Sequence, residues 1–453
     1  MLSIDGRTQL PLLARWFLPA LFLFLLVSGC SRAPTGPAPT AFTPDAGATS
    51  VPPPLPVQSE EAQRRWREDL HVLVERAQAM HPDLTYRVSE EAFAAMVAAI
   101  ESSIPFHSDE QIILDFIRLM ALSDGHSRLQ PHGGQGGFGL YDLQLYQFGD
   151  ELYVVDAADS QQEAVGARLV AIGDVPVVEA RRRLEPLVAR ENEMFVHNYL
   201  PLFAVTPEVL EALEIVEDPA RPGFVLEDGS GSRFTLDPPI LSLPDTLILA
   251  DTFEQLLLPP RPELLYLSRH QEEWFWYTLL EEDNTFYVQY NRVQPTTQTG
   301  QSIYAFVAEL DEALQGNEVS RLVLDLRHNM GGELGYQDRL LEWLQAYSAD
   351  RPGTLFVLIG RQTFSAGSYL TSQLENTTDA VFVGEPTGSR PNFYANSRPV
   401  RLPNSPITAH VSTRYYEPSA ADDEREWIAP HISAPPSAAA YFAGRDPALE
   451  AIR

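Results

Sequence analysis

The chain has 453 residues, and its 62 Asp and Glu residues against 32 basic residues give a formal charge of -30. A phosphate backbone would be repelled by this charge, so a nucleic-acid partner is excluded. All 32 of these basic residues are arginine, and the chain has no lysine. This excludes a lysine general base, a lysine Schiff base and a Walker-type phosphate site. The single cysteine excludes an intramolecular disulfide and a thiolate metal cluster.

Residues 1–29 predict a lipoprotein signal peptide. Two arginines precede the apolar run 16–27, which is too short to span a bilayer comfortably. The run ends at Val27-Ser28-Gly29-Cys30, which resembles the lipobox of bacterial lipoproteins. The resemblance implies lipidation of Cys30 and a place in the bacterial cell envelope, lipid-anchored on an extracytoplasmic side. An uncleaved signal anchor or a chance cysteine is the alternative.

Residues 30–58 are rich in Pro, Ala, Thr and Ser and predict an extended tether. Residues 59–128 then predict a helical domain, with helices over 59–80 and 89–103 and a third that begins at a capping-box spacing at Ser108. The third helix ends at Asp124-Gly125-His126-Ser127, which places His126 on a loop. A single histidine is more often structural than catalytic, so His126 becomes a candidate only through the motifs described below.

Residues 129–282 predict a β-rich module and a connecting segment. Gly134 to Gly139 spells G-x-G-x-x-G, but no strand precedes it and no helix follows, so it predicts a loop and no dinucleotide site. Strands are predicted at 151–155 and 167–172. Residues 216–282 give no clear chemical signal.

Residues 283–453 alternate between buried strands and helices. The expected strands are 286–290, 322–326, 355–359 and 381–383, and the expected helices are 303–314, 334–344 and 365–374. This alternation predicts a parallel sheet, whose active site lies at the carboxyl ends of the strands.

Two turns at those strand ends carry unusual residues. In the turn after 322–326, Gly331 and Gly332 allow tight turning and expose backbone N–H groups. In the turn after 355–359, Ser365 stands at the first turn of a helix. Its hydroxyl suits either an N-cap or a nucleophile whose oxyanion the helix terminus would stabilise.

Three motifs occur in order along the chain: Asp325-Leu326-Arg327-x-Asn329-x-Gly331-Gly332, Ser365-Ala366-Gly367 and Val383-Gly384-Glu385-Pro386-Thr387-Gly388. Together they resemble the C-terminal processing (tail-specific) serine peptidase family, over about residues 60–450. The resemblance implies a mixed α/β fold with an N-terminal helical domain, a small PDZ-like β module and a ClpP/crotonase-like αβ catalytic core. It also implies a peptide or protein substrate and no cofactor.

The residue that acts as base separates two branches of this family. Members with a Ser/Lys dyad place a lysine after the Gly-Glu-Pro-Thr segment, where this chain has Arg390, which does not lose its proton in proteins. The chain instead resembles the tricorn-core branch, which implies His126 as base and Glu424 as the supporting carboxylate, with Glu426 as a close competitor. In tricorn a serine precedes the histidine, whereas Gly125 stands there in this chain.

The predicted reaction is acyl transfer to Ser365, with His126 as general base. The resulting oxyanion would be held by the N–H groups of Ala366 and of Gly331 or Gly332. His328 is the alternative base. Separately, Asp325 and Arg327 are predicted to brace the turn at the strand end.

The rival function is a catalytically inactive protein of this fold that binds apolar ligands or peptides. Convergence of Ser365, His126 and the glycine turn would distinguish the peptidase from this rival. A metal hydrolase ranks third, because the 10 histidines are scattered and none forms H-E-x-x-H. The sequence determines neither the cleaved substrate nor the oligomeric state.

Overall fold

A computed structural model describes residues 56–132, 137–189, 191–241, 256, 258–269, 273–297 and 299–453. The predicted signal peptide, the Cys30 lipidation site and nearly all of the tether lie outside these residues. Within them, no helix combines the length and the apolar character needed to cross a membrane. The mixed α/β fold class is confirmed, as are the N-terminal helices.

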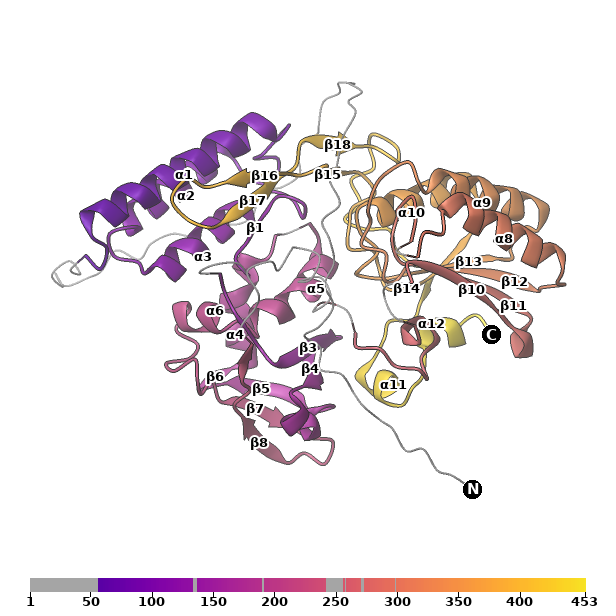
Figure 1. The fold of residues 1–453 in the computed structure, drawn as a ribbon, viewed down its shortest axis with the longest axis horizontal. Helices are drawn as coiled ribbons and strands as arrows, with labels where there is room; N and C mark the ends of the chain where they lie inside the picture. The colour runs from indigo at the N-terminus through magenta and orange to yellow at the C-terminus, as the bar shows by residue number, and fades with distance from the viewer. Residues whose placement is uncertain are drawn as a thin grey trace. The chain divides into compact units, whose positions relative to one another are not determined.

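The N-terminal helices are α1 (Glu60–Met80), α2 (Glu90–Ser103) and α3 (Asp109–Met120), drawn in indigo and purple in Figure 1. A serine side chain caps each of them, and Ser108 forms the predicted capping box with Gln111. Their apolar faces bury Leu70, Phe93 and Phe116 in one core. Because α3 is buried along most of its length, the loop that follows it starts from a fixed point.

A six-stranded antiparallel sheet follows, with the path β3-β4-β5-β7-β8 and β6 paired to β5. Its strands are β3 (Leu143–Phe148), β4 (Glu151–Ala157), β5 (Arg168–Ile172), β6 (Val175–Pro176), β7 (Phe224–Glu227) and β8 (Arg233–Leu236). Its helices are α4 (Val177–Leu184), α5 (Glu193–Phe203) and α6 (Pro207–Ala212), and α5 contacts the edge strand β3. The module therefore takes two strands from the 216–282 segment that gave no signal.

The C-terminal core is a second six-stranded sheet of order β10-β11-β12-β13-β14-β19. Its strands are β10 (Phe275–Leu280), β11 (Thr285–Tyr290), β12 (Arg321–Asp325), β13 (Leu355–Ile359), β14 (Val381–Gly384) and β19 (Ile432–Ser433). All neighbours pair in parallel except β10 and β11. The predicted parallel sheet is therefore confirmed, with an antiparallel strand added at one edge.

Helices cover both faces of this sheet (Figure 1). They are α8 (Ile303–Gln315), α9 (Asp338–Asp350) and α10 (Ala366–Thr377) on one face and α11 (Ala438–Phe442) and α12 (Pro447–Glu450) toward the other. Buried side chains such as Leu324 and Val357 face the first group, whereas Val323 and Leu358 pack with Leu449 of α12. Successive side chains along each strand thus point to opposite faces of the sheet, and each face contributes to a separate hydrophobic core.

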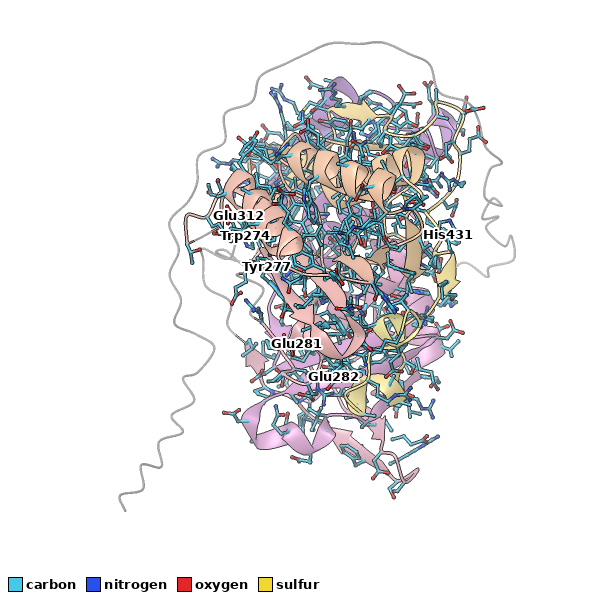
Figure 2. All side chains as sticks on the ribbon, turned by 90° about the vertical axis from the view of Figure 1, so that its right-hand side faces the viewer. Trp274, Tyr277, Glu281, Glu282, Glu312 and His431 are labelled. Atoms are coloured by element: carbon cyan, nitrogen blue, oxygen red, sulfur yellow. The ribbon has the colours of Figure 1, made fainter. Side chains whose placement is uncertain are left out.

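Figure 2 shows the side of the edge strand β10, with Tyr277 in the strand, Trp274 just before it and Glu281 and Glu282 in the turn after it. Glu312 of α8 is labelled nearby in that view. Glu281 and Glu282 are exposed. Charged residues at an edge strand oppose pairing with another chain. His431, labelled on the other side of the same view, accepts a hydrogen bond from the N–H of Phe382 in β14 at 2.9 Å.

Short strands join distant parts of the chain. The pairs are β1 (Arg128–Gln130) with β17 (Thr408–Val411), β17 with β16 (Arg398–Arg401), β15 (Phe393–Ala395) with β18 (Arg414–Tyr416), and β2 (Leu140–Tyr141) with β9 (Ile240–Leu241). In the first pair, Arg128 lies opposite His410. The segment that follows the His126 loop is therefore hydrogen-bonded to the late part of the chain.

Candidate active site

Ser365 lies between β13 and α10 in a backbone conformation that few residues adopt. Its φ of 54° and ψ of -123° fall outside the regions favoured for a residue with a Cβ. Ser365 occupies the N-cap position of α10, but its side chain makes no capping hydrogen bond to the helix. Its own N–H donates to Ser389 Oγ at 3.0 Å. The strained turn therefore presents a hydroxyl that the helix does not use.

The glycine turn after β12 lies directly against this hydroxyl. Gly331 has φ 100°, and a Cβ placed there would stand 2.6 Å from Ser365 Cβ and 3.0 Å from Ser365 Oγ. The turn is fixed by buried Asn329, whose carbonyl accepts the N–H of Phe364 at 3.0 Å and whose Nδ2 donates to the Tyr290 carbonyl at 2.7 Å. Two βα turns far apart in sequence thus meet at one point, as predicted.

The three predicted oxyanion donors occupy different environments. The N–H of Gly331 donates to Asn329 Oδ1 at 3.0 Å, so it is already bound in this structure. The N–H of Ala366 is at the first position of α10, where no intrahelical acceptor exists, and lies 2.8 Å from a Cβ placed on Gly331. A Cβ on Gly332 would lie within 2.0 Å of the Val293 carbonyl oxygen. Ala366 is therefore the donor that the geometry supports most directly.

His126 is held between two aromatic rings. Its ring stacks on Phe364 at 4.4 Å between centroids and on Phe393 at 5.7 Å, and its side chain is 11% exposed. Neither ring nitrogen has a hydrogen-bond partner among the residues that the structure describes. Burial lowers the pKa of His126 to about 4, so the imidazole is neutral near pH 7, the form in which it accepts a proton.

Phe364 immediately precedes Ser365, so the stacking brings the imidazole to the turn that carries the serine. No hydrogen bond joins the His126 ring to Ser365 within the described ranges. In structures without substrate, catalytic hydrogen bonds are often long or not formed. The structure therefore brings the two residues to the same turn without joining them.

Asp124 anchors the loop that carries His126. Its Oδ1 accepts hydrogen bonds from the N–H groups of His126 at 2.8 Å and Ser127 at 3.0 Å and from Ser412 Oγ at 2.8 Å. Its Oδ2 lies 2.9 Å from His81 Nε2. Burial by itself would raise the pKa of Asp124, but the hydrogen bond and charge of His81 outweigh it and lower the pKa to about 2. The carboxylate is thus charged, and its Oδ1 lies 4.0 Å from His126 Nδ1.

The two late carboxylates considered from the sequence do not contact the imidazole. Glu424 is exposed and makes no hydrogen bond or ion pair in the part of the chain that is described. Glu426 pairs with Arg390 Nη2 at 2.7 Å. The alternative base His328 lies on the glycine turn, where its Nδ1 is 2.9 Å from Gln362 Oε1 and its ring stacks on Tyr266.

The sequence did not identify Glu191 as a site residue. This carboxylate is 1% exposed, and its Oε2 accepts the N–H of Gly125 at 3.0 Å. Its Oε1 accepts the N–H of Arg390 at 3.4 Å. No spacing in the sequence marks such a residue, because both contacts are to backbone groups of remote segments. A Glu followed by the helix-capping Asn192 is the only local feature there.

The predicted brace at the strand end is confirmed and extended. Arg327 Nη2 lies 2.6 Å from Asp325 Oδ2 and 2.8 Å from Asp446 Oδ2, and its guanidinium stacks over the Tyr266 ring at 3.9 Å. The network ties β12 to the N-terminus of α12. Its cation is fully paired, so it has a structural role rather than one in proton transfer.

No group of three or more His, Cys, Asp or Glu side chains that could hold a metal ion occurs among the described residues. A pocket of about 40 Å³ lies near the His126 loop and is lined mostly by apolar side chains. Its walls include Ile117, Leu129, Leu187, Phe195, Leu202 and Phe203. The 5.2 Å contact between Phe195 and Phe364 separates it from the serine turn.

Comparison with known proteins identifies the core. Residues 284–434 match the sequence model of peptidase family S41, and none of the curated proteins compared with the chain matches it significantly. The solved structure of mature CPAF complexed with lactacystin is similar at 12% identity and a TM-score of 0.59, over 85% of this chain and 96% of that one. Mature CPAF gives 12% identity and a TM-score of 0.57 over 84% and 94%.

These two likenesses show a shared fold. The photosystem II D1 C-terminal processing protease matches at 16% identity over 83% of this chain and 93% of that one, with a TM-score of 0.37 that carries no argument. The family match covers the strands from β11 to β19, the glycine turn and Ser365. Over residues 284–434 the core is therefore similar to peptidase family S41.

Proposed function

We propose that the protein is a serine peptidase that hydrolyses peptide bonds through an acyl-enzyme, with Ser365 as nucleophile and His126 as base. The single observation that carries this proposal is the convergence at one turn of three features. They are a strained serine whose hydroxyl caps no helix, a glycine turn against that hydroxyl, and an imidazole whose ring nitrogens make no hydrogen bond among the described residues. A protein that only bound ligands would gain nothing from the strain at Ser365.

In the proposed reaction, Ser365 Oγ attacks the peptide carbonyl while His126 takes its proton, and a C–O bond forms. The N–H of Ala366 stabilises the oxyanion, helped by the N-terminal end of α10. His126 then gives its proton to the leaving amine as the C–N bond breaks. Water, deprotonated by the same imidazole, releases the acyl group and restores the Ser365 hydroxyl.

The choice of His126 over a Ser/Lys dyad rests on residue chemistry and position. The chain contains no lysine. Arg390, at the position of the dyad lysine, donates from Nε to the Glu191 carbonyl at 3.2 Å and pairs with Glu426 at 2.7 Å. We extend the proposal to a tricorn-like branch, to trimming of protein C-termini or cleavage of oligopeptides, and to a lipid anchor at Cys30 in the bacterial cell envelope. The antiparallel module of β3 to β8 is proposed to be PDZ-like.

The test is covalent labelling of a soluble form that begins at residue 31 with a fluorophosphonate probe. Wild type should be labelled, whereas Ser365→Ala and His126→Ala should not. Ser372→Ala, on the same helix, and His71→Ala, on the exposed face of α1, serve as matched controls and should label as wild type does. Equal labelling of Ser365→Ala would contradict the assignment of the nucleophile.

The apolar pocket near the His126 loop favours a second candidate, an inactive member that binds apolar ligands. This candidate predicts that wild type fails to label. It also predicts that a fluorescent apolar dye binds wild type and that Phe195→Ala, which changes the pocket wall, alters its affinity. Labelling that depends on Ser365 would reject this candidate.

A further inference from the structure

We propose that Glu191 is a positioning residue that holds the His126 loop in register with the serine turn. This inference rests on the proposed function, because it assigns a role within the same site. It also supplies a buried carboxylate for a site in which Glu424 makes no contact with the imidazole.

The first step of the argument is the pair of hydrogen bonds that the carboxylate accepts. One oxygen takes the N–H of Gly125 at 3.0 Å, and Gly125 directly precedes His126. The other takes the N–H of Arg390 at 3.4 Å. One side chain therefore joins a segment of the helical part to a segment of the core.

The second step is the link from Arg390 to the nucleophile. Ser389, its neighbour, accepts the N–H of Ser365 on its Oγ at 3.0 Å. Ser389 is itself buried, and its carbonyl accepts a hydrogen bond from the Thr387 hydroxyl at 2.8 Å. Displacement of the 387–390 segment would thus be transmitted to the backbone at Ser365.

The third step is that the backbone of Glu191 is fixed from both sides. Its carbonyl accepts hydrogen bonds from Arg87 Nη1 at 3.0 Å and from Arg390 Nε at 3.2 Å. The next residue, Asn192, donates to the carbonyls of Thr387 at 3.0 Å and Glu426 at 2.8 Å. Because the backbone of Glu191 is held in place, its carboxylate can fix the positions of the Gly125 and Arg390 N–H groups that it binds.

The fourth step concerns Gly125, which stands where tricorn has a serine. A Cβ at this position would lie 3.0 Å from Glu191 Cβ, 3.2 Å from Phe195 Cε2 and 3.3 Å from Phe364 Cε2. The absence of a side chain lets the loop lie directly on Glu191 and on the ring that stacks with His126. Gly125 therefore bonds to the Glu191 carboxylate through its backbone N–H and uses no side-chain hydroxyl.

An ionised carboxylate is better suited to this role than an amide. It offers acceptor positions on both oxygens, whereas a glutamine has one acceptor oxygen and an NH₂ group that would face an N–H donor. Burial raises the pKa of Glu191, the nearby Asp124 charge adds to this, and the Gly125 N–H opposes it.

The test measures the second-order rate constant for fluorophosphonate acylation and the fraction of protein labelled, together with kcat and KM for a peptide substrate. Glu191→Gln should slow acylation and kcat at least about tenfold, because small displacements of reacting groups have large effects. KM and the labelled fraction should stay close to wild type. A purely structural role would instead lower the melting temperature and the labelled fraction.

Asp115→Asn is the matched control, since Asp115 of α3 is a buried carboxylate whose partners, His107 and Arg118, are outside the proposed site. It should lower stability and leave the acylation rate unchanged. Gly125→Ala is a second perturbation that displaces the loop while keeping the carboxylate, and it should also slow acylation. If Glu191→Gln does not fold, Gly125→Ala decides the question.

A wild-type acylation rate in Glu191→Gln, or in Gly125→Ala where Glu191→Gln does not fold, would overturn the proposal. Failure of the proposed function gives a different result, because wild type would then not be labelled at all. The two failures are therefore distinguishable in one experiment.

Discussion

Substitution of Gly331 by alanine tests the site at its most crowded point. The added methyl group would lie 2.6 Å from Ser365 Cβ, 3.0 Å from Ser365 Oγ and 2.8 Å from the Ala366 nitrogen. It would thus occupy space between the nucleophile and the donor assigned to the oxyanion. Gly331 also has φ 100°, which is unfavourable for any residue with a Cβ.

Two contributions to the effect can be separated. The backbone strain costs about 1–3 kcal/mol of the free energy of unfolding. Loss of an oxyanion donor costs roughly 100- to 1,000-fold in kcat. Gly335 supplies the matched control, because its φ of 103° imposes the same strain and no atom lies within 4 Å of a Cβ placed there. Gly335→Ala should therefore lose only the stability that the backbone strain costs. Gly331→Ala should lose more stability, because its methyl group also clashes with Ser365 and Ala366, and it alone should lose activity.

Urea unfolding gives the stability of each variant, and fluorophosphonate acylation and peptide hydrolysis give its activity. We expect acylation of Gly331→Ala to fall by at least about 100-fold, in line with the loss of an oxyanion donor, while Gly335→Ala remains near wild type. Equal activity in the two variants, high or low, would refute the reasoning. It would show that the contact with Ser365 does not govern the reaction.

Burial lowers the pKa of His126 and His132 to about 4 in the folded state, below the value near 6.5 of an unfolded chain. As the pH falls, the unfolded chain therefore binds protons before the folded protein does. The free energy of unfolding, measured by urea titration, should decrease between pH 6.5 and 4 by on the order of 3 kcal/mol for each ring. A free energy that does not change over this pH range would contradict the prediction. Asp124→Ala should lower the free energy of unfolding by about 3–5 kcal/mol, because its buried partners lose their acceptor; a change below about 0.5 kcal/mol, typical of surface sites, would remove the loop-anchor role. Arg390→Lys in a His126→Ala background should remain unlabelled by the fluorophosphonate, since position 390 faces other groups; labelling would indicate a Ser/Lys dyad.

The core sheet was predictable because its strands are continuous apolar runs. The expected strand 355–359 coincides with β13, and 286–290 and 381–383 lie within β11 and β14. Parallel strands buried on both faces leave this signal in the sequence. The edge strand β10 was not predicted, because its last four residues are only partly buried and acidic residues follow it directly. The pairing of β1 with β17 had no local signal either, since the two strands are far apart in the chain.

The candidate site was predicted in part for the same physical reason. Strand ends in a parallel sheet meet at one edge, so Ser365 and the glycine turn could be placed together from their positions after two strands. The N–H of Gly331 was expected to be available, but the side chain of Asn329 binds it. Glu191 escaped prediction because side-chain contacts to remote backbone groups leave no periodic or motif signal. The partner of a loop is decided by tertiary packing, which spacing alone does not encode.

The absence of lysine has a structural consequence that connects these observations. A Ser/Lys dyad would lie wholly within the core, whereas His126 reaches the serine turn from the helical part of the chain. That part is attached to the core by hydrogen bonds at the loop itself, from Ser412 Oγ to Asp124 and from the Ser412 N–H to Ser127 Oγ at 2.9 Å. The pairing of β1 with β17 and the two contacts of Glu191 add to this attachment. Formation of the proposed catalytic pair is therefore coupled to docking of the helical part, and we expect a change that loosens this docking to move His126 away from Ser365.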